Sequence, residues 1–249
     1  MEDEIRRLVQ EPRISVEAQT FLRKWPSFSE PCLMVCDDKR QYVVKGGCNR
    51  LSRAICNEQI VARLGLKIGA PVAVPCFVAV PAELIQAERQ LSHITSALSH
   101  GNQFHENHSD RAWVAHATEP GNRTRFALLS VLYGWAYAGD RQLIYANTAP
   151  HLVLSVDHGH FFPSGPNWCA ENLIGTAPAV CEPDIVRDAA LTSAEIKIAL
   201  QQLGSITTSD VCQAVSSPPD EWGLSLDERF AIARFLWMRR EQLLQSTGS

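Results

Sequence analysis

Apolar and polar positions divide the first third of the chain into a helix, a hairpin, a second helix and a strand. The apolar positions of residues 5–25 predict a helix that ends near Pro26. The stretch PCLMVCDDKRQYVVKGG has two apolar runs around a polar turn at residues 37–40, which predicts a β-hairpin. Apolar residues at helical spacing predict a helix over residues 52–64 that stops at Gly65, and GAPVAVPCFVAVP predicts a strand region.

The rest of the chain is mostly helical in pattern, with one further hairpin. Residues 82–123 have little periodicity and include a polar, histidine-bearing loop, HGNQFHENHSD, whereas residues 126–138, FALLSVLYGWAYA, predict a buried helix. QLIYA and HLVLSV predict a hairpin around a turn at residues 147–150. SAEIKIALQQL and SLDERFAIARFLWMRREQLL predict two amphipathic helices, with Arg239 and Arg240 on a solvated face of the second. A small strand-rich half thus precedes a larger helical half, which predicts an α+β fold.

Composition narrows the class of protein. The chain has 249 residues, of which 45% are hydrophobic and 20% charged, as in an ordinary globular protein. Its formal net charge of -4 argues against direct nucleic-acid binding, and no apolar run is long enough to predict a membrane span. The N-terminus, MEDEIRRLVQ, lacks the apolar core of a secretion signal, and the eight cysteines include no Cys-x-x-Cys pair. We therefore expect a cytoplasmic protein with reduced thiols.

The second hairpin brings two aspartates toward one end. With a four-residue turn at residues 147–150, Leu143 pairs with Leu154 and Asp140 stands opposite Asp157. Two carboxylates at that spacing repel each other, and one pKa rises unless a cation lies between them. A divalent metal, or a division of the pair into a base and a metal ligand, removes the conflict.

The first hairpin places a lysine at the end of its second strand. With the turn at residues 37–40, Leu33 pairs with Val44, and Lys45 ends the strand in YVVKGG. Glu58 lies in the following predicted helix, within reach of that lysine. A strand lysine held by a helix glutamate is the arrangement with which kinases orient nucleotide phosphates. Taken alone, the pair is more typical of a surface salt bridge.

These four residues, in this order, resemble the skeleton of the HipA-like kinase family. The stretches that carry the resemblance are YVVKGG with NEQIVARLGLKIGAPV, then AGDRQLIY, and above all SVDHGHFFPSGPNW. The closing stretch PPDEWGLSLDERFAIARFLWMRR is similar to the C-terminal helices of that family. The resemblance extends over residues 31–244.

The resemblance implies a two-lobed protein-kinase-like fold with ATP in the cleft between the lobes. Lys45 would hold the ATP phosphates, with Glu58 as its ion-pair partner. Asp140 would be the catalytic aspartate that orients or deprotonates the acceptor hydroxyl. Asp157 would bind Mg²⁺, since it stands where kinases carry the aspartate of their Asp-Phe-Gly motif.

The chain departs from the usual kinase pattern at two points. It has no GxGxxG loop, and residues 46–50, GGCNR, are the nearest glycine-bearing phosphate cradle. The asparagine that many kinases place five residues after the catalytic aspartate is Tyr145 here, so Gln142 or Asn147 is the candidate for a second metal ligand. These departures leave a nucleotide-binding pseudokinase as the alternative function.

The positions of the histidines suggest a further alternative function. His158 and His160 form a His-x-His pair beside an aspartate, a pattern also found in transition-metal sites, and further histidines stand at His100, His105 and His108. A His/Asp metal-dependent hydrolase is therefore the rival enzyme class, although the chain contains no HExxH motif. In the kinase interpretation, His158 and His160 order the metal loop through hydrogen bonds.

The sequence thus predicts a single kinase-like domain, with a small lobe at residues 1–82, including the leading helix, and a larger lobe at residues 83–249. The predicted function is ATP- and Mg²⁺-dependent transfer of the γ-phosphate to a hydroxyl group, with a protein as the expected acceptor. Neither a membrane nor a nucleic acid is expected as a partner.

Overall fold

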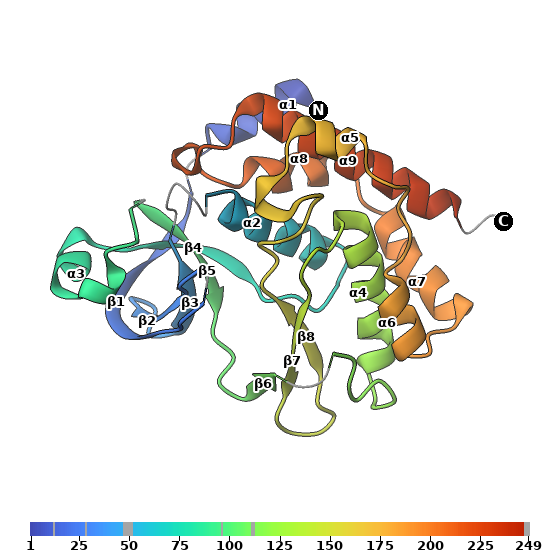
Figure 1. The fold of residues 1–249 in the computed structure, drawn as a ribbon, viewed down its shortest axis with the longest axis horizontal. Helices are drawn as coiled ribbons and strands as arrows, with labels where there is room; N and C mark the ends of the chain where they lie inside the picture. Colours follow the sequence, from blue (N-terminus) through green and yellow to red (C-terminus); the bar gives the residue numbers. More distant parts are fainter. Residues whose placement is uncertain (12, 28, 47–51, 96, 111–112, 247–249) are drawn as a thin grey trace.

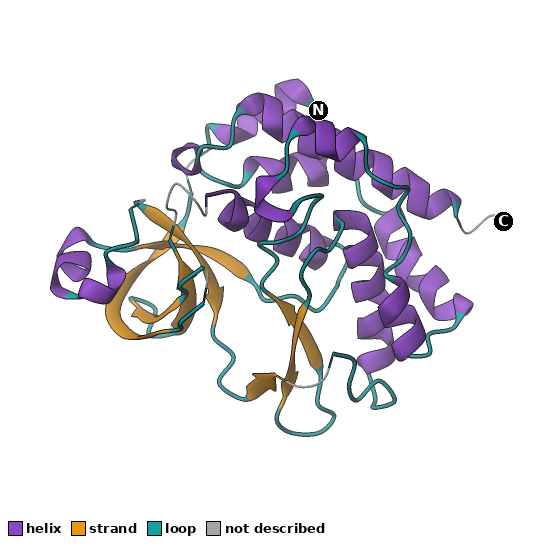
Figure 2. Cartoon of the chain, viewed as in Figure 1, coloured by secondary structure: helices purple, strands orange, loops and turns teal. Residues whose placement is uncertain are grey.

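A closed β-barrel forms one side of the molecule and most of the helices form the other, with a small sheet between them (Figures 1 and 2). The computed structural model describes residues 1–246 apart from residues 12, 28, 47–51, 96 and 111–112. Two separate apolar cores, one inside the barrel and a larger one among the helices, correspond to the two halves that the sequence predicts.

The barrel has the strand order β1-β2-β3-β5-β4 and is closed by a parallel pairing of β1 with β4. Its strands are β1 (Ser15–Lys24), β2 (Cys32–Cys36), β3 (Gln41–Lys45), β4 (Pro75–Ala79) and β5 (Leu98–Gln103). Alternate side chains of β2 and β3, among them Met34 and Val44, fill the interior. The barrel therefore fixes the end of β3, where Lys45 lies.

The helix predicted for residues 5–25 is wrong in its second half. Helix α1 (Glu2–Val9) is short, and residues Ser15–Lys24 form strand β1. Ala18 is buried in the barrel core and Val16 packs against it, so this segment follows the two-residue period of a strand. Pairing with β2 and β4 outweighs the helical pattern of the isolated segment.

The first hairpin forms as predicted, but its register is wrong by one residue. Leu33 pairs with Val43 instead of Val44, because the turn is one residue shorter than the predicted four. Lys39 takes a left-handed conformation with φ of 67°, as in the common three-residue hairpin loop. Lys45 still ends the second strand.

Helix α2 (Ser52–Lys67) begins where predicted and continues past the expected stop at Gly65. A Cβ at Gly65 would lie 2.8 Å from a methyl carbon of Val72 and 3.0 Å from one of Leu132, so this glycine allows close packing. The chain leaves the helix near Gly69, which has φ of +74°. Helix α2 belongs to the larger core, which anchors Glu58 on the helical side of the molecule.

The helical half surrounds α4 (Asn122–Ala136), which is buried along nearly its whole length, as predicted. The other helices are α3 (Ala82–Ala87), α5 (Ala170–Ile174), α6 (Pro183–Asp188), α7 (Ser193–Gly204), α8 (Thr208–Ser216) and α9 (Leu226–Gln245), with short 3-10 turns η1 (Arg89–Leu91), η2 (Gly165–Asn167) and η3 (Asp220–Trp222). A three-stranded sheet has the order β6-β7-β8, with β6 (His108–Asp110), β7 (Gln142–Ala146) and β8 (Val153–Val156). The stretch HGNQFHENHSD, expected to be a loop, contributes to β5 and β6 instead.

The second hairpin also has a register one residue away from the predicted one. Leu143 pairs with Ser155 instead of Leu154, because the connecting loop is one residue longer than expected. Asp157 leaves the strand with φ of 57°, so it is not the ladder partner of Asp140. The predicted pairing of the two aspartates is therefore wrong, although both lie at the open end of the hairpin.

The boundary between the two halves differs in detail from the expected one near residue 82. The last barrel strand, β5, ends at Gln103. Helix α1, expected with the small lobe, packs against α8 and α9 in the helical half (Figure 1). The barrel is thus assembled from residues 15–103, with α2 inserted between β3 and β4.

Two arginines of α9 are buried instead of solvated. The Arg239 guanidinium donates to the carbonyl oxygens of Trp135 at 3.0 Å and Ala177 at 2.9 Å, and Arg240 donates to that of Leu203 at 3.2 Å. Burial lowers the pKa of Arg239 to about 10. Arg239 satisfies a carbonyl at the C-terminal end of α4 that has no partner within its own helix, so its charge has a structural role that hydrophobic periodicity does not reveal.

The described cysteines form no disulfide. Burial raises the pKa of Cys32 to about 11 and that of Cys56 to about 12, so these thiols are poor nucleophiles. None of the helices in the described ranges has the length and apolar character that a bilayer crossing requires.

Candidate active site

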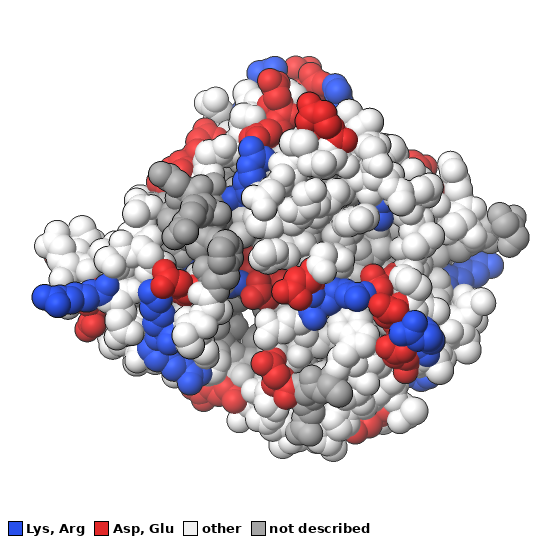
Figure 3. Space-filling view, in the orientation of Figure 1, with Lys and Arg blue, Asp and Glu red and all other residues white. Residues whose placement is uncertain are grey.

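A hollow of about 160 Å³ lies where the barrel meets the helical half. Its described lining comes from the β1–β2 loop, β3, α2, the segment before β7 and the loop after β8: Ser27, Ser29, Lys45, Ala54, Ile55, Glu58, Asp140, Asp157, Gly159 and His160. Acidic and basic side chains occur side by side across the middle of the face in Figure 3, and neither sign covers it. Four of the five predicted site residues thus line one hollow.

Lys45 binds both nearby carboxylates. Its Nζ lies 2.5 Å from Oε1 of Glu58 and 2.7 Å from Oδ1 of Asp157. The Lys45 and Glu58 side chains are 7% and 1% exposed, whereas that of Asp157 is 40% exposed. Burial opposes the charge on Lys45, but Glu58 and then Asp157 outweigh it and raise the pKa of Lys45 above its usual value. The lysine is therefore a fixed positive charge beside a carboxylate that solvent can reach.

Glu58 connects α2 to the loop that carries Asp157. Its Oε2 accepts a hydrogen bond from the backbone N–H of His158 at 2.9 Å. Burial would raise the pKa of Glu58, but the charge of Lys45 and these hydrogen bonds lower it, so the group is ionised. One buried carboxylate thus positions both the lysine and the backbone next to Asp157.

His158 orders this loop, as expected. Its buried ring lies with Nε2 2.9 Å from the hydroxyl of Ser155, which is in turn 2.7 Å from that of Tyr133. Burial lowers the pKa of His158, so the ring is neutral. His160, in contrast, is exposed and lines the hollow.

Asn57 also positions the loop, and sequence reasoning missed it. Its buried amide donates to the carbonyl oxygens of Gly159 at 2.9 Å and Phe161 at 3.0 Å, and its oxygen accepts from the Trp168 indole at 3.1 Å. The signal in the sequence that could have identified Asn57 was a polar residue at a buried position of the predicted helix, next to Glu58. Asn57 and Glu58 together attach the DHGHFF segment to α2.

Asp140 reaches the hollow through the backbone instead of the strand ladder. An isolated bridge joins Ala138 to Phe161, just before β7 begins. Gly139 packs so closely on the loop that a Cβ there would lie 2.3 Å from the carbonyl oxygen of His160. Asp140 is exposed, and its Oδ1 accepts from the backbone N–H of Arg141 at 2.8 Å. Its carboxylate therefore lies at the open side of the site.

Gln142 and Asn147, the candidates for a second metal ligand, are not brought to the hollow. The Gln142 amide donates to Oδ1 of Asp110 at 3.3 Å, and the Asn147 amide oxygen accepts from the Ser109 hydroxyl at 2.7 Å. Tyr145, at the position of the usual asparagine, is buried. Among the described lining residues, the carboxylates that solvent can reach are those of Asp140 and Asp157.

The proposed phosphate cradle at residues 46–50 lies, apart from Gly46, outside the described residues. The β1–β2 loop instead contributes Ser27 and Ser29 to the lining of the hollow. The sequence signal for this loop was PSFSEP, a polar, proline-bounded segment between two strands. Serine hydroxyls are suitable partners for phosphate oxygens.

The donor set fits a hard divalent cation. Magnesium is usually held by one or two carboxylates together with substrate phosphates and water, and Asp140 and Asp157 supply two carboxylates. Lys45 neutralises part of their charge without closing access to Asp157. The site therefore suits a cation that prefers oxygen ligands better than a softer metal such as Zn²⁺, which favours nitrogen and sulfur ligands.

The histidines of the hydrolase alternative do not assemble into a metal site. Within the described part of the chain, the group of three metal-ligand side chains whose donor atoms lie close together is His116, Glu119 and His151. His158 and His160 are not part of it. The zinc pattern read around Asp157 is therefore not supported by the geometry.

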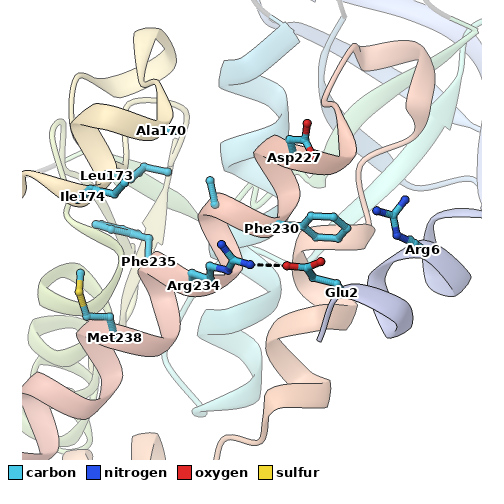
Figure 4. Close-up of a pocket in the computed structure, with 11 residues that line it drawn as sticks. Glu2, Arg6, Ala170, Leu173, Ile174, Asp227, Phe230, Arg234, Phe235 and Met238 are labelled. Atoms are coloured by element: carbon cyan, nitrogen blue, oxygen red, sulfur yellow. Dashed lines mark hydrogen bonds and ion pairs between the residues drawn. The ribbon is translucent and has the colours of Figure 1, made fainter.

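A larger hollow of about 490 Å³ lies elsewhere, between α1, α5 and α9 (Figure 4). It is lined by apolar side chains such as Phe230 and Phe235 and by an ion pair of Arg234 with Glu2. Two of its charged groups, Arg234 and Glu2, pair with each other, and its lining includes none of the residues around Lys45. Size alone thus does not identify the candidate site.

Comparison with known proteins identifies a family and a fold. The model of the HipA-like kinase family matches residues 21–162, more than half of the chain. The crystal structure of the Helicobacter pylori proinflammatory kinase CtkA is similar over 94% of this chain and 96% of that chain, with a TM-score of 0.59 and 8% sequence identity. The Golgi casein kinase is similar with a TM-score of 0.46 and 11% identity, over 100% of this chain and 77% of that chain. A search of curated proteins finds no match. The likeness to CtkA shows that the chain has a two-lobed, protein-kinase-like α+β fold.

Proposed function

The chain belongs to the HipA-like kinase family, and from this premise we propose that it transfers the γ-phosphate of ATP to a hydroxyl group, with Mg²⁺ as the metal and a protein as the acceptor. The observation that carries the proposal is the convergence of Lys45, Glu58 and Asp157 within hydrogen-bond distance, with Asp140 in the same hollow. We propose a single kinase-like domain whose two lobes meet at this hollow.

Each residue has a role that follows from its surroundings. Lys45 is a compact, fixed charge that binds phosphate oxygens, and Glu58 determines where that charge points. Asp157 is exposed enough to exchange its contact with Lys45 for a metal ion, which supplies positive charge to the phosphate oxygens. Ser27 and Ser29 lie where hydroxyl groups can contact the nucleotide.

Asp140 acts on the acceptor. Its exposed carboxylate accepts the proton of the acceptor hydroxyl as the bond from that oxygen to the γ-phosphorus forms. The bond between the γ-phosphorus and its bridging oxygen breaks in the same displacement, and ADP leaves with that oxygen. Most of the rate then comes from positioning and charge neutralisation by Lys45 and Asp157.

A nucleotide-binding pseudokinase is the second candidate. The observation that favours it is the orientation of Gln142, which contacts Asp110 and leaves the described part of the site with two accessible carboxylates and no amide ligand. A site of this kind still binds a nucleotide through Lys45 and Asp157, and phosphate transfer is slow or absent.

Two measurements separate these functions. Mg-ATP should raise the melting temperature of the wild type and not that of Lys45→Met, since a ligand selective for the folded state stabilises it. Transfer from labelled ATP should fall at least about 100-fold in Asp140→Asn and Asp157→Asn. Asp188→Asn, the same change at an exposed position outside the hollow, is the matched control. Stabilisation by Mg-ATP with no transfer in the wild type identifies the pseudokinase, and no stabilisation rejects both functions.

A further inference from the structure

A second cluster of polar side chains lies at the loop end of the β7–β8 hairpin. His116 and Glu119 precede α4, and His151 is in the loop between β7 and β8, next to each other in space. His151 and Asp157 flank strand β8 (Val153–Val156) and are six positions apart, which is at most roughly 20 Å at about 3.3 Å per residue. The cluster is thus at the opposite end of the β7–β8 hairpin from Asp157 and the proposed ATP site.

The donor atoms of the three side chains lie within 4.8 Å of one another, and both imidazole rings contact the Glu119 carboxylate. Nδ1 of His116 lies 2.7 Å from Oε1 of Glu119, and Nδ1 of His151 lies 3.0 Å and 2.9 Å from the two carboxylate oxygens. The two imidazole rings are stacked, with centroids 4.2 Å apart and planes at 16°. Ligand atoms around a tetrahedral zinc ion are about 3.3 Å apart. To bind a metal ion between these donors, the two rings would turn out of their stack so that each Nδ1 points at the ion in place of its hydrogen bond to Glu119.

The backbone holds the donors in place. The amide nitrogen of buried Asn122 donates to the carbonyl oxygens of His116 at 2.9 Å and His151 at 3.1 Å, and its oxygen accepts from the N–H of Val153 at 3.0 Å. The backbone N–H of Glu119 donates to the carbonyl of His116 at 3.0 Å, which places both side chains on one turn. One buried amide thus connects the two segments that carry the ligands.

Both histidines also have an uncommon backbone conformation. His116 has φ of 54° and His151 has φ of 42°, in the left-handed region that non-glycine residues adopt in only a few per cent of cases, histidine more often than most. Such conformations persist where the surrounding structure fixes them, and they cluster at ligand sites. The three side chains are 23% to 27% exposed, so an ion can enter from solvent and keep a position open for water.

We propose that His116, Glu119 and His151 bind a divalent transition-metal ion of the zinc class. Two imidazoles and one carboxylate with an open fourth position are a ligand set that suits Zn²⁺, whereas Mg²⁺ prefers oxygen donors alone. The ion joins the turn before α4 to the loop of the β7–β8 hairpin. It acts as a structural clip and is not required to take part in phosphate transfer.

The test uses the full chain freed of metal with a chelator and titrated with Zn²⁺ or Co²⁺. We expect one tight Co²⁺ site per chain, with visible absorption bands and no thiolate-to-cobalt charge-transfer band, and no displacement by excess Mg²⁺. His151→Ala and Glu119→Gln should each weaken Zn²⁺ binding by more than about 100-fold, since the loss of an outer-shell partner alone commonly costs roughly 10–100-fold. His105→Ala, a change to a histidine outside the cluster, should bind as the wild type does.

Imidazole NMR spectra of the wild type make the test independent of how the variants fold. Zn²⁺ should shift the ring signals of two of the eight histidines. Shifts at any other pair, a thiolate band, equal binding by the wild type and His151→Ala, or no binding at all would each overturn the proposal.

Discussion

The two ends of the β7–β8 hairpin carry polar clusters that are held together in different ways. At the open end, the side chains of Lys45 and Glu58 are 7% and 1% exposed, and their charges hold each other in place. At the loop end, His116, Glu119 and His151 are about a quarter exposed, and backbone contacts determine where they lie. Buried charges depend strongly on their partners, whereas partly exposed ones tolerate the loss of a partner.

The largest loss of stability is expected from a substitution in the buried cluster of Lys45 and Glu58. Glu58→Ala leaves Lys45 buried without its main counter-charge and the N–H of His158 without its acceptor. Removing one partner of a buried pair costs about 3–5 kcal/mol, so we expect the free energy of unfolding in urea to fall by that amount. The matched control is Glu119→Ala, measured in the presence of a chelator, which should lose much less. Equal losses at the two glutamates would show that burial does not distinguish the clusters.

A smaller effect is expected at Asn57, which supports the same loop without carrying charge. Asn57→Ala leaves the carbonyls of Gly159 and Phe161 and the indole N–H of Trp168 without their partner. A buried polar group that loses its hydrogen bond costs about 1–3 kcal/mol, and the loop that carries Asp157 should loosen. We expect both a lower free energy of unfolding and slower phosphate transfer with little change at the loop end, measured as unaltered Zn²⁺ binding. Loss of stability with full transfer would show that Asn57 does not position the site.

How far the sequence predicted these features depends on the range of the interactions. The order of Lys45, Glu58, Asp140 and Asp157 identified the family, and all four line one hollow. The ladder argument for the two aspartates failed, because a one-residue error in loop length shifts every pair along a hairpin. The two aspartates are brought to the same hollow instead by an isolated bridge and by close packing at Gly139. No local sequence pattern predicts either contact.

The remaining differences come from long-range packing. Residues 15–24 form a strand only because β2 and β4, distant in sequence, provide its partners. Arg239 is buried because the carbonyls at the end of α4 need donors. The histidine cluster is invisible in the sequence, since His151 lies 32 residues from Glu119 and in a loop of another hairpin.

The smallest expected effect concerns pH and involves His100, a buried neighbour of the open-end cluster. Its Nδ1 lies 3.0 Å from the amide nitrogen of Gln59, whose oxygen is held by Arg63 at 3.1 Å. The ring therefore accepts at Nδ1 and carries its proton on Nε2, which faces the Asn102 side chain at 3.0 Å. The buried side-chain oxygen of Asn102 has no partner within the described residues. With the Asn102 amide turned so that this oxygen faces Nε2 of His100, the oxygen accepts the proton of the ring. Each ring nitrogen then has a partner only when the histidine is neutral.

The stability of the protein should therefore fall as the pH is lowered. Burial, followed by the charge of Lys45, lowers the pKa of His100 well below its usual value, so below about pH 6.5 the unfolded chain binds a proton that the folded protein does not. Glu58 has a lowered pKa too, but its contribution is lost only at more acidic pH, near the usual range of a carboxylate. Urea unfolding at pH 7.5 and 5.5 should show a loss in the wild type that is smaller in His100→Gln. Part of the loss should remain, because burial also lowers the pKa of His158. An identical loss in the variant would mean that His100 takes up its proton in the folded state, and that the network around Glu58 is more open to water than its burial indicates.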